Sequence, residues 1–378
     1  MNPTPIPRAR GFAPTTGLPG LDAVLSGVAP GDNIVWQIQS LADYGALVRP
    51  YAAAALARGD RLIYFRFASH ATLLPEDGGA EIHRPRPEDG FDAFVDQVHS
   101  VIEAAGPQAL YVFDCLSELA DAWQSDRMLG NFFRLTCPRL FDLDTVTYFG
   151  VLRNRHAHAG MDMITETTQY LLDVFRCRDR LYVKPIKVQH RSAAAMNLIH
   201  AWEAGDRFRP VADSGTVAEI LAGSGWPGLE DEQIRSHWQQ LFDAARTVSA
   251  LRRAGAPDTA AEASWFARLA RLLFPEEAGL QRLLERYLTL DDLLEVRARM
   301  IGIGTIGGKA AGMLVARAVL RRDASGLHAR LEAHDSFYVG SEVFDTFFVR
   351  NGLWWIRRRQ RDPAGFLQGL DGDDGARA

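Results

Sequence analysis

Lysine is nearly missing from this chain of 378 residues: Lys184, Lys187 and Lys309 are the three in the sequence, and the other strongly basic residues are arginines. Basic residues total 42 against 47 acidic ones, which gives a formal net charge of −5. A chain with this balance has no global basic field to recruit nucleic acid or a membrane surface, so we expect neither as a partner. The scarcity also makes each lysine a candidate for a specific role.

Cysteine is rare as well, and long apolar runs are missing. Cys115, Cys137 and Cys177 are odd in number and do not have the spacing of metal ligands, so a reducing, cytoplasmic setting is favoured. No run approaches the ~18 apolar residues of a transmembrane helix. The proline-rich start, residues 1–10, has no apolar signal region. We therefore expect a cytoplasmic protein.

What is present is typical of a globular protein. Apolar residues make up 47% and charged residues 24%, and the length suggests two or three domains. In the first half, apolar runs alternate with helical patterns, which predicts an α/β domain with a mostly parallel sheet and right-handed crossovers. The expected strands are 33–38, 62–67, 110–114, 146–152, 182–188 and 199–202, and the expected helices are 41–58, 91–105 and 128–140.

The character of the chain changes after about residue 211, where loop residues precede a nearly all-helical stretch. A glycine-rich segment then begins at Ile301. The sequence predicts a flexible lead at 1–14, an α/β domain at 15–212, a helical connector at 213–300, a partial α+β segment at 301–362 and a disordered tail at 363–378.

The glycine-rich segment is the strongest candidate for a binding site. It reads IGIGTIGGKAAGM over residues 301–313, and a helical pattern follows it. Glycines let the backbone approach a ligand closely, and a helix start adds a partial positive charge. Gly307, Gly308 and Lys309 together predict a phosphate cradle, although the spacing is not that of a Walker A motif. The alternative interpretation is an ordinary turn before a helix.

Residues 307–313 resemble the start of the nucleotide-binding domain of phosphoenolpyruvate (PEP) synthase and pyruvate phosphate dikinase, an ATP-grasp family. The resemblance continues through His334–Ser341 and Asn351–Trp355, and it covers roughly the last 80 residues. In that family a GGK-type loop opens the domain and its lysine contacts ATP phosphates. The resemblance therefore implies nucleotide binding at Gly307, Gly308 and Lys309, with ATP and Mg²⁺ as cofactors.

A second resemblance covers roughly residues 11–210. Thr16–Asp22, the turn at Pro30-Gly31 and the strand after it look like the opening of RecA-like ATPases of the KaiC group. Leu110–Leu119 resembles that group's Walker B strand and the segment after it. This likeness implies a RecA-like fold for the α/β domain.

The Walker A loop of that group is degenerate here. The sequence between the first strand and its helix is QIQSLADYG over residues 37–45, without the paired glycines, the lysine or the Ser/Thr. A hydrolytic site needs positive compensation for the triphosphate, and Asp43 adds a negative charge instead. We therefore expect no phosphate loop there, and we interpret Asp114 as a structural residue at a strand end. Ser40 is expected to cap the following helix with Asp43.

Two further groups of polar residues each allow two interpretations. His156 and His158, with two arginines nearby, follow a strand. They are interpreted as part of a solvated loop, the alternative being an anion or metal site. Lys184 and Lys187 are interpreted as lying on a solvent-facing side of a strand, the alternative being a partner surface.

Together the resemblances imply an ATP-binding protein related to PEP synthase and pyruvate phosphate dikinase. The family's phosphohistidine domain and PEP/pyruvate barrel are not in this sequence, so we expect no independent catalysis and assign no catalytic or metal-ligating residue. One alternative is a regulatory or scaffold module that assembles through the RecA-like fold, including as a homo-oligomer. The other is one half of a split phosphotransferase whose partner, encoded by an adjacent gene, carries the rest of the ATP-grasp domain.

Overall fold

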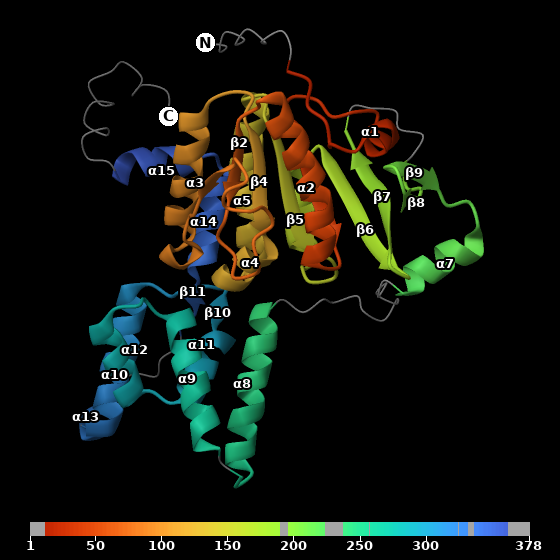
Figure 1. The fold of residues 1–378 in the computed structure, drawn as a ribbon. Coiled ribbons are helices and arrows are strands. Elements are labelled where there is room, and N and C mark those ends of the chain that lie inside the picture. The colour runs from red at the N-terminus through yellow and green to blue at the C-terminus, as the bar shows by residue number, and fades with distance from the viewer. Residues whose placement is uncertain are drawn as a thin grey trace, which may run out of the picture. The chain divides into compact units, whose positions relative to one another are not determined.

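The structure is a computed structural model, and the chain divides into two compact units, residues 1–234 and 235–378 (Figure 1). Most of the predicted lead, the whole predicted tail at 363–378, and His334-Asp335 of the PEP synthase-like stretch lie outside the residues that it describes. The predicted boundaries at residues 212 and 300 stay predictions. The described residues are 12–189, 196–223, 237–256, 258–323, 325–331 and 336–361.

A nine-stranded sheet forms the centre of the N-terminal unit. From β3 to β6 neighbouring strands pair in parallel, and from β6 to β9 they pair antiparallel. The predicted α/β class with a mostly parallel sheet is confirmed. In spatial order the strands are β3 (Glu81–His83), β2 (Leu62–Phe65), β4 (Leu110–Cys115), β5 (Val146–Leu152), β1 (Asn33–Ile38), β6 (Tyr170–Cys177), β7 (Arg180–Val188), β8 (His200–Glu203) and β9 (Arg207–Pro210).

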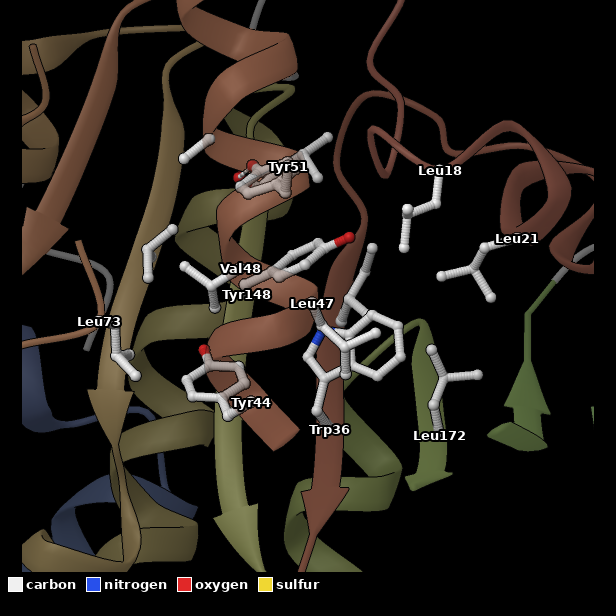
Figure 2. Packing of buried hydrophobic residues seen from close by; sticks show 14 of the residues in the cluster. Leu18, Leu21, Trp36, Tyr44, Leu47, Val48, Tyr51, Leu73, Tyr148 and Leu172 are labelled. Carbon is white, nitrogen blue, oxygen red and sulfur yellow. Dashed lines mark hydrogen bonds between the residues drawn. The ribbon is translucent and has the colours of Figure 1, made fainter. Parts of the chain in front are cut away.

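Helices cover both faces of this sheet (Figure 1). Successive residues of β1 face opposite sides of the sheet, and both sides are buried, as expected for a strand that is covered on both faces. On one side, α2 packs aromatic residues against the sheet (Figure 2): Tyr51 stacks on Tyr148 of β5, with ring centroids 4.0 Å apart. The helices of this unit are α1 (Pro19–Leu25), α2 (Leu41–Arg58), α3 (Phe91–Ala105), α4 (Ser117–Trp123), α5 (Asp126–Asp142), α6 (His158–Thr167) and α7 (Ser214–Gly223), with a 3₁₀ turn at Pro87–Asp89.

The other face of the sheet has a second aromatic layer. Phe113 of β4 contacts Phe132 of α5 at 5.9 Å and Phe149 of β5 at 4.8 Å between ring centroids. Phe94 of α3 packs edge-on against Phe132. Phe94, Phe113, Phe132 and Phe149 are fully buried. The two aromatic layers fix the sheet between helices and leave its strand ends to form the polar features described below.

Some elements were missed or predicted too long. Strand β6 and helix α6 were not predicted, and the strand expected at 62–67 ends at Phe65. The N–H of Arg66 still donates to the His83 carbonyl of β3, but those of Phe67 and Ala68 donate to the Asp114 carboxylate instead of continuing the ladder.

The C-terminal unit is mainly helical, with a two-stranded parallel sheet of β10 and β11. One buried core joins its helices to the glycine-rich segment, since Trp238 and Leu273 belong to the same cluster as Ile306 and Tyr338. Within the described ranges, no helix is long and apolar enough to cross a membrane. The elements are α8 (His237–Arg253), α9 (Thr259–Leu273), α10 (Ala278–Tyr287), α11 (Leu290–Ala298), β10 (Met300–Ile301), α12 (Gly308–Asp323), α13 (Ser325–His328), β11 (Tyr338–Val339), α14 (Ser341–Arg350) and α15 (Trp354–Arg361).

Candidate functional site

The glycine-rich segment forms a tight loop between β10 and α12. Gly302 and Gly304 have φ angles of +76° and +92°, a region in which residues with a side chain are strained. Ile306 anchors the end of the loop: its side chain is buried, and its N–H donates to the carbonyl of Leu273 at 2.8 Å. The loop therefore has one defined path between the strand and the helix.

The start of α14 holds this loop from the side. The N–H groups of Ser341 and Glu342 donate to the carbonyls of Thr305 and Ile303 at 2.9 and 3.2 Å. In return, the Ser341 hydroxyl and the Glu342 carboxylate accept the N–H groups of Thr305 and Ile303, each at 3.2 Å. Gly340 permits this close contact, because a Cβ there would lie 2.1 Å from the Ile303 carbonyl oxygen. Reciprocal hydrogen bonds of this kind make the loop a preorganised backbone rather than a mobile turn.

The three predicted binding residues lie together where the loop becomes helix. Gly307, Gly308 and Lys309 are exposed, and apart from the adjoining backbone no atom lies within 4 Å of the place where a Cβ would be on either glycine. Gly308 and Lys309 begin α12, a helix of 16 residues. A helix start presents unpaired N–H groups and a partial positive charge, and the lysine adds a full one. The arrangement is capable of accepting an anionic group at the glycine pair.

In the N-terminal unit, the connection from β1 to the start of α2 has a different geometry from the loop before α12. Only Gln39 and Ser40 separate β1 from α2. As predicted, Ser40 and Asp43 form a capping box, in which each side chain accepts the other residue's backbone N–H. The buried Asp43 carboxylate also accepts from the Arg176 guanidinium at 2.7 Å. The start of α2 is thus closed by its own cap and carries a carboxylate, which makes it unsuited to bind phosphate.

Asp114, at the end of β4, is enclosed by donors. It is fully buried and forms an ion pair with Arg66 at 2.8 Å. The N–H groups of Phe67 and Ala68 each donate to the same carboxylate at 2.9 Å, and the Tyr64 hydroxyl donates to its other oxygen. These contacts support the interpretation of Asp114 as a structural residue, because its acceptor sites are filled by the protein.

His156 does not lie in a solvated loop, so that interpretation was wrong. It is buried, with Nε2 2.7 Å from the Ser117 hydroxyl and Nδ1 2.7 Å from the Asp126 carboxylate. These distances match those of a Ser-His-Asp triad. However, Ser117 is only 1% exposed and its oxygen accepts the N–H of Leu152 at 2.8 Å, so it is not positioned to attack a substrate. The group joins the start of α5 to the segment after β5.

His158 and the two strand lysines do not belong to the group around His156. His158 is exposed at the start of α6. The solvent-facing interpretation of the strand lysines was wrong for Lys187, which is half-buried and donates to the carbonyl of Thr165 at 2.5 Å. Burial lowers the pKa of Lys187. Lys184 is also partly buried, and it lies opposite Asp173 in the register of β6 and β7.

Sequence reasoning did not foresee a buried charge pair at the end of β5. The Arg153 guanidinium lies over the ring of Phe175 at 4.0 Å and 3.9 Å from the Asp173 carboxylate. Burial raises the pKa of Asp173, which Arg153 and Lys184 partly oppose. The only signal in the sequence was a carboxylate inside the apolar run Tyr170–Phe175, a run that was not predicted as a strand.

Comparison with known proteins identifies no family for this chain. No protein-family model matches the chain, and no curated protein is similar to it in sequence. In the part of the chain that the structure covers, no cluster of three or more His, Cys, Asp or Glu side chains is arranged to hold a metal ion.

Proposed function

We propose that the chain binds the triphosphate of ATP at Gly307, Gly308 and Lys309. The observation that carries the proposal is the geometry of this corner: an exposed glycine pair with open space beside it and a lysine in the first turn of α12. Backbone N–H groups at a helix start and a mobile ammonium together suit phosphate oxygens. The hydrogen bonds to α14 support it further, because a preorganised loop loses less entropy on binding.

Mg²⁺ would enter this site with the nucleotide. Mg²⁺ is commonly held by one or two carboxylates together with substrate phosphates. Glu342 is an acidic residue in contact with the loop, but it is buried and its carboxylate accepts the Ile303 N–H. We therefore infer that the phosphates, rather than a preformed protein cage, provide most of the ligands.

For the N-terminal unit we propose a RecA-like fold that does not hydrolyse nucleotide. The two-residue connection between β1 and α2, the capping box with Asp43 and the filled acceptor sites of Asp114 support this proposal. With no catalytic residue assigned in either unit, the proposed activity is nucleotide binding of the kind related to PEP synthase and pyruvate phosphate dikinase, without independent phosphotransfer.

A second candidate function is that of one half of a composite phosphotransferase, and an open apolar face favours it. Met300 and Tyr338 face the core, whereas Ile301 and Val339, on the opposite side of the same two-stranded sheet, are 51% and 49% exposed. Parallel sheets are normally covered on both faces. A partner chain carrying further ATP-grasp structure would supply that cover. Co-purification with the product of an adjacent gene tests this candidate.

Calorimetric titration of the purified chain with ATP, with and without Mg²⁺, tests the main proposal. We expect weak, saturable binding that falls as salt is added, because phosphate contacts at an exposed helix start are screened. Binding that is undetectable at millimolar ATP, alone and with an adjacent-gene partner, would make the loop a structural relic and favour the scaffold interpretation.

A further inference from the structure

A cavity opens in the C-terminal unit where α9, the end of α10 and the start of α11 meet, and its volume is about 430 Å³. Helices α9 and α10 lie side by side there (Figure 1). Pockets that bind small molecules measure roughly 300–1,000 Å³, so this cavity has the size of a ligand site. Its lining shares no residue with the glycine-rich loop or with α12.

One face of α9 and two leucines give the cavity an apolar wall. Ala263, Phe266 and Ala267 line it together, because residues three and four apart are neighbours on the surface of a helix. Phe266 is half-buried and packs against the core of this unit, and Leu288 and Leu290 are buried. The short side chains of the two alanines leave room for a ligand. The wall therefore suits a hydrocarbon chain or a ring.

The charged groups in the lining are both carboxylates, those of Glu262 and Glu285. Glu262 is paired with Arg252 at 3.2 Å. Glu285 is exposed near the end of α10, and in the described part of the chain its carboxylate has neither an ion pair nor a hydrogen bond. One negative charge is thus available to a ligand, whereas the lining has no basic side chain that would receive an anion.

Two helix starts border the cavity, but both are capped. At α9, the Asp258 side chain accepts the Ala261 N–H at 2.9 Å. At α11, Thr289 and Asp292 form a capping box, in which the Thr289 hydroxyl donates to the Asp292 carboxylate at 2.7 Å. Each cap brings a carboxylate that opposes the partial positive charge of its helix start. The two helix starts therefore do not favour an anion in the cavity.

We propose that this cavity binds a small organic cation, an ammonium group attached to an apolar body. The ammonium group pairs with Glu285, and the apolar body packs against Phe266 and the two leucines. The aromatic wall also favours a cation, because the face of the ring carries partial negative charge. A molecule the size of benzene occupies a cavity of about 150 Å³, so a body of that size and its ammonium group fit here.

The inference goes beyond ATP binding and does not depend on it. ATP is an anion, and the residues proposed to contact it, Gly307, Gly308 and Lys309, do not line the cavity.

Three ligands with the same hydrocarbon chain test the inference: hexylammonium chloride, 1-hexanol and sodium hexanoate, added to the full chain at an ionic strength matched with sodium chloride. Calorimetry measures affinity, and thermal unfolding measures the accompanying stabilisation. We expect saturable binding of hexylammonium, about two- to fivefold tighter than that of hexanol, which is the usual worth of an exposed ion pair. Hexanoate should bind most weakly. Butylammonium should bind more weakly than hexylammonium, by about fourfold for each methylene that is no longer buried.

Glu285→Gln keeps the shape of the side chain and removes its charge. It should lower the affinity for hexylammonium to that for hexanol and leave the affinity for hexanol unchanged. Ala263→Leu, at an exposed position in the lining, should abolish binding of both ligands by filling the space. Glu276→Gln, at an exposed position before α10 and outside the lining, is the matched control and should bind like the unaltered chain. Thermal unfolding without ligand shows whether each variant is folded.

Lys309→Ala separates this inference from the proposed ATP site, because it should leave binding of hexylammonium unchanged even where ATP binding is lost. Three results would overturn the inference. They are no saturable binding of hexylammonium at millimolar concentration, equal affinities of the unaltered chain for hexylammonium and hexanol, and equal affinities for hexylammonium in the unaltered chain and in Glu285→Gln.

Discussion

Lys309 is the side chain on which the proposed phosphate site depends most. It is exposed, in the first turn of α12, so its removal should not disturb the fold. Lys309→Ala should weaken binding of Mg-ATP about ten- to hundredfold, the equivalent of ~1.5–3 kcal/mol for a hydrogen bond to a charged group. Lys309→Arg should restore only part of the affinity, because a planar guanidinium does not replace a compact ammonium at a tight glycine turn. Calorimetry measures both variants.

Lys184→Ala is the matched control, since Lys184 is in the N-terminal unit on β7. It should leave ATP affinity unchanged. Equal affinity in the unaltered chain and in Lys309→Ala would contradict the assignment of the site.

Asp114 provides a test of a structural role against a metal-binding role. Asp114→Asn keeps the shape of the side chain but removes the charge opposite Arg66, and it turns part of a filled acceptor into a donor facing Tyr64. We expect the free energy of unfolding to fall by ~2–3 kcal/mol in urea denaturation, with unchanged ATP affinity. Unchanged stability together with loss of Mg²⁺-dependent nucleotide binding would instead identify Asp114 as a metal ligand.

Single residues were predictable from the sequence where their partners are local. Ser40 and Asp43 are three residues apart, and their capping box follows from that spacing. His156 was not predictable in this way, because its partners Ser117 and Asp126 are 39 and 30 residues away. In the Arg153–Asp173 pair, likewise, Arg153 follows β5 whereas Asp173 lies on β6. Contacts of this kind exist only once the sheet has set the strand order.

At the scale of elements, β8 contains a buried histidine whose titration couples strand packing to pH. His200 pairs with Val183 of β7 and is only 4% exposed. Burial lowers its pKa below the ordinary value of 6.5. Below about pH 6.5 the unfolded chain takes up a proton that the folded chain resists, so this contribution to stability is present above that pH and is lost as pH falls.

Urea denaturation between pH 8 and pH 5 measures this effect. We expect His200→Gln to lose stability less steeply on acidification than the unaltered chain. His158→Gln, at an exposed position on α6, should retain the original slope. The same slope in His200→Gln and in the unaltered chain would show that His200 does not contribute.

Elements with clear boundaries in the sequence were predicted well, such as α2 with its cap and α3 with its apolar spacing. The elements that were missed lack such signals. Helix α6 begins without a side-chain cap. In β6 the buried Asp173 interrupts an otherwise apolar run. Tertiary packing and charge pairing, rather than local preference, decide these segments.

On the scale of the whole molecule, composition and alternation of elements were sufficient to predict the α/β class and the mostly parallel sheet. They did not predict that the segment after residue 300 shares one core with the helices before it. That sharing depends on Ile306 and Tyr338 packing against residues such as Leu273, which spacing along the chain does not reveal.

The proposed division of roles, nucleotide binding in the C-terminal unit and a non-hydrolysing RecA-like N-terminal unit, rests on the contrast between two helix starts. The start of α12 is open, and that of α2 is closed by the capping box of Ser40 and Asp43.

Hydrogen–deuterium exchange of the full chain, with and without saturating Mg-ATP, compares these two helix starts in one measurement. The account predicts slower exchange of backbone amides in peptides covering residues 302–313 and no change in peptides covering residues 37–45, with the protection of 302–313 lost in Lys309→Ala. Slower exchange at 37–45 with no change at 302–313 would contradict the account, because it would place the nucleotide at the capped start of α2.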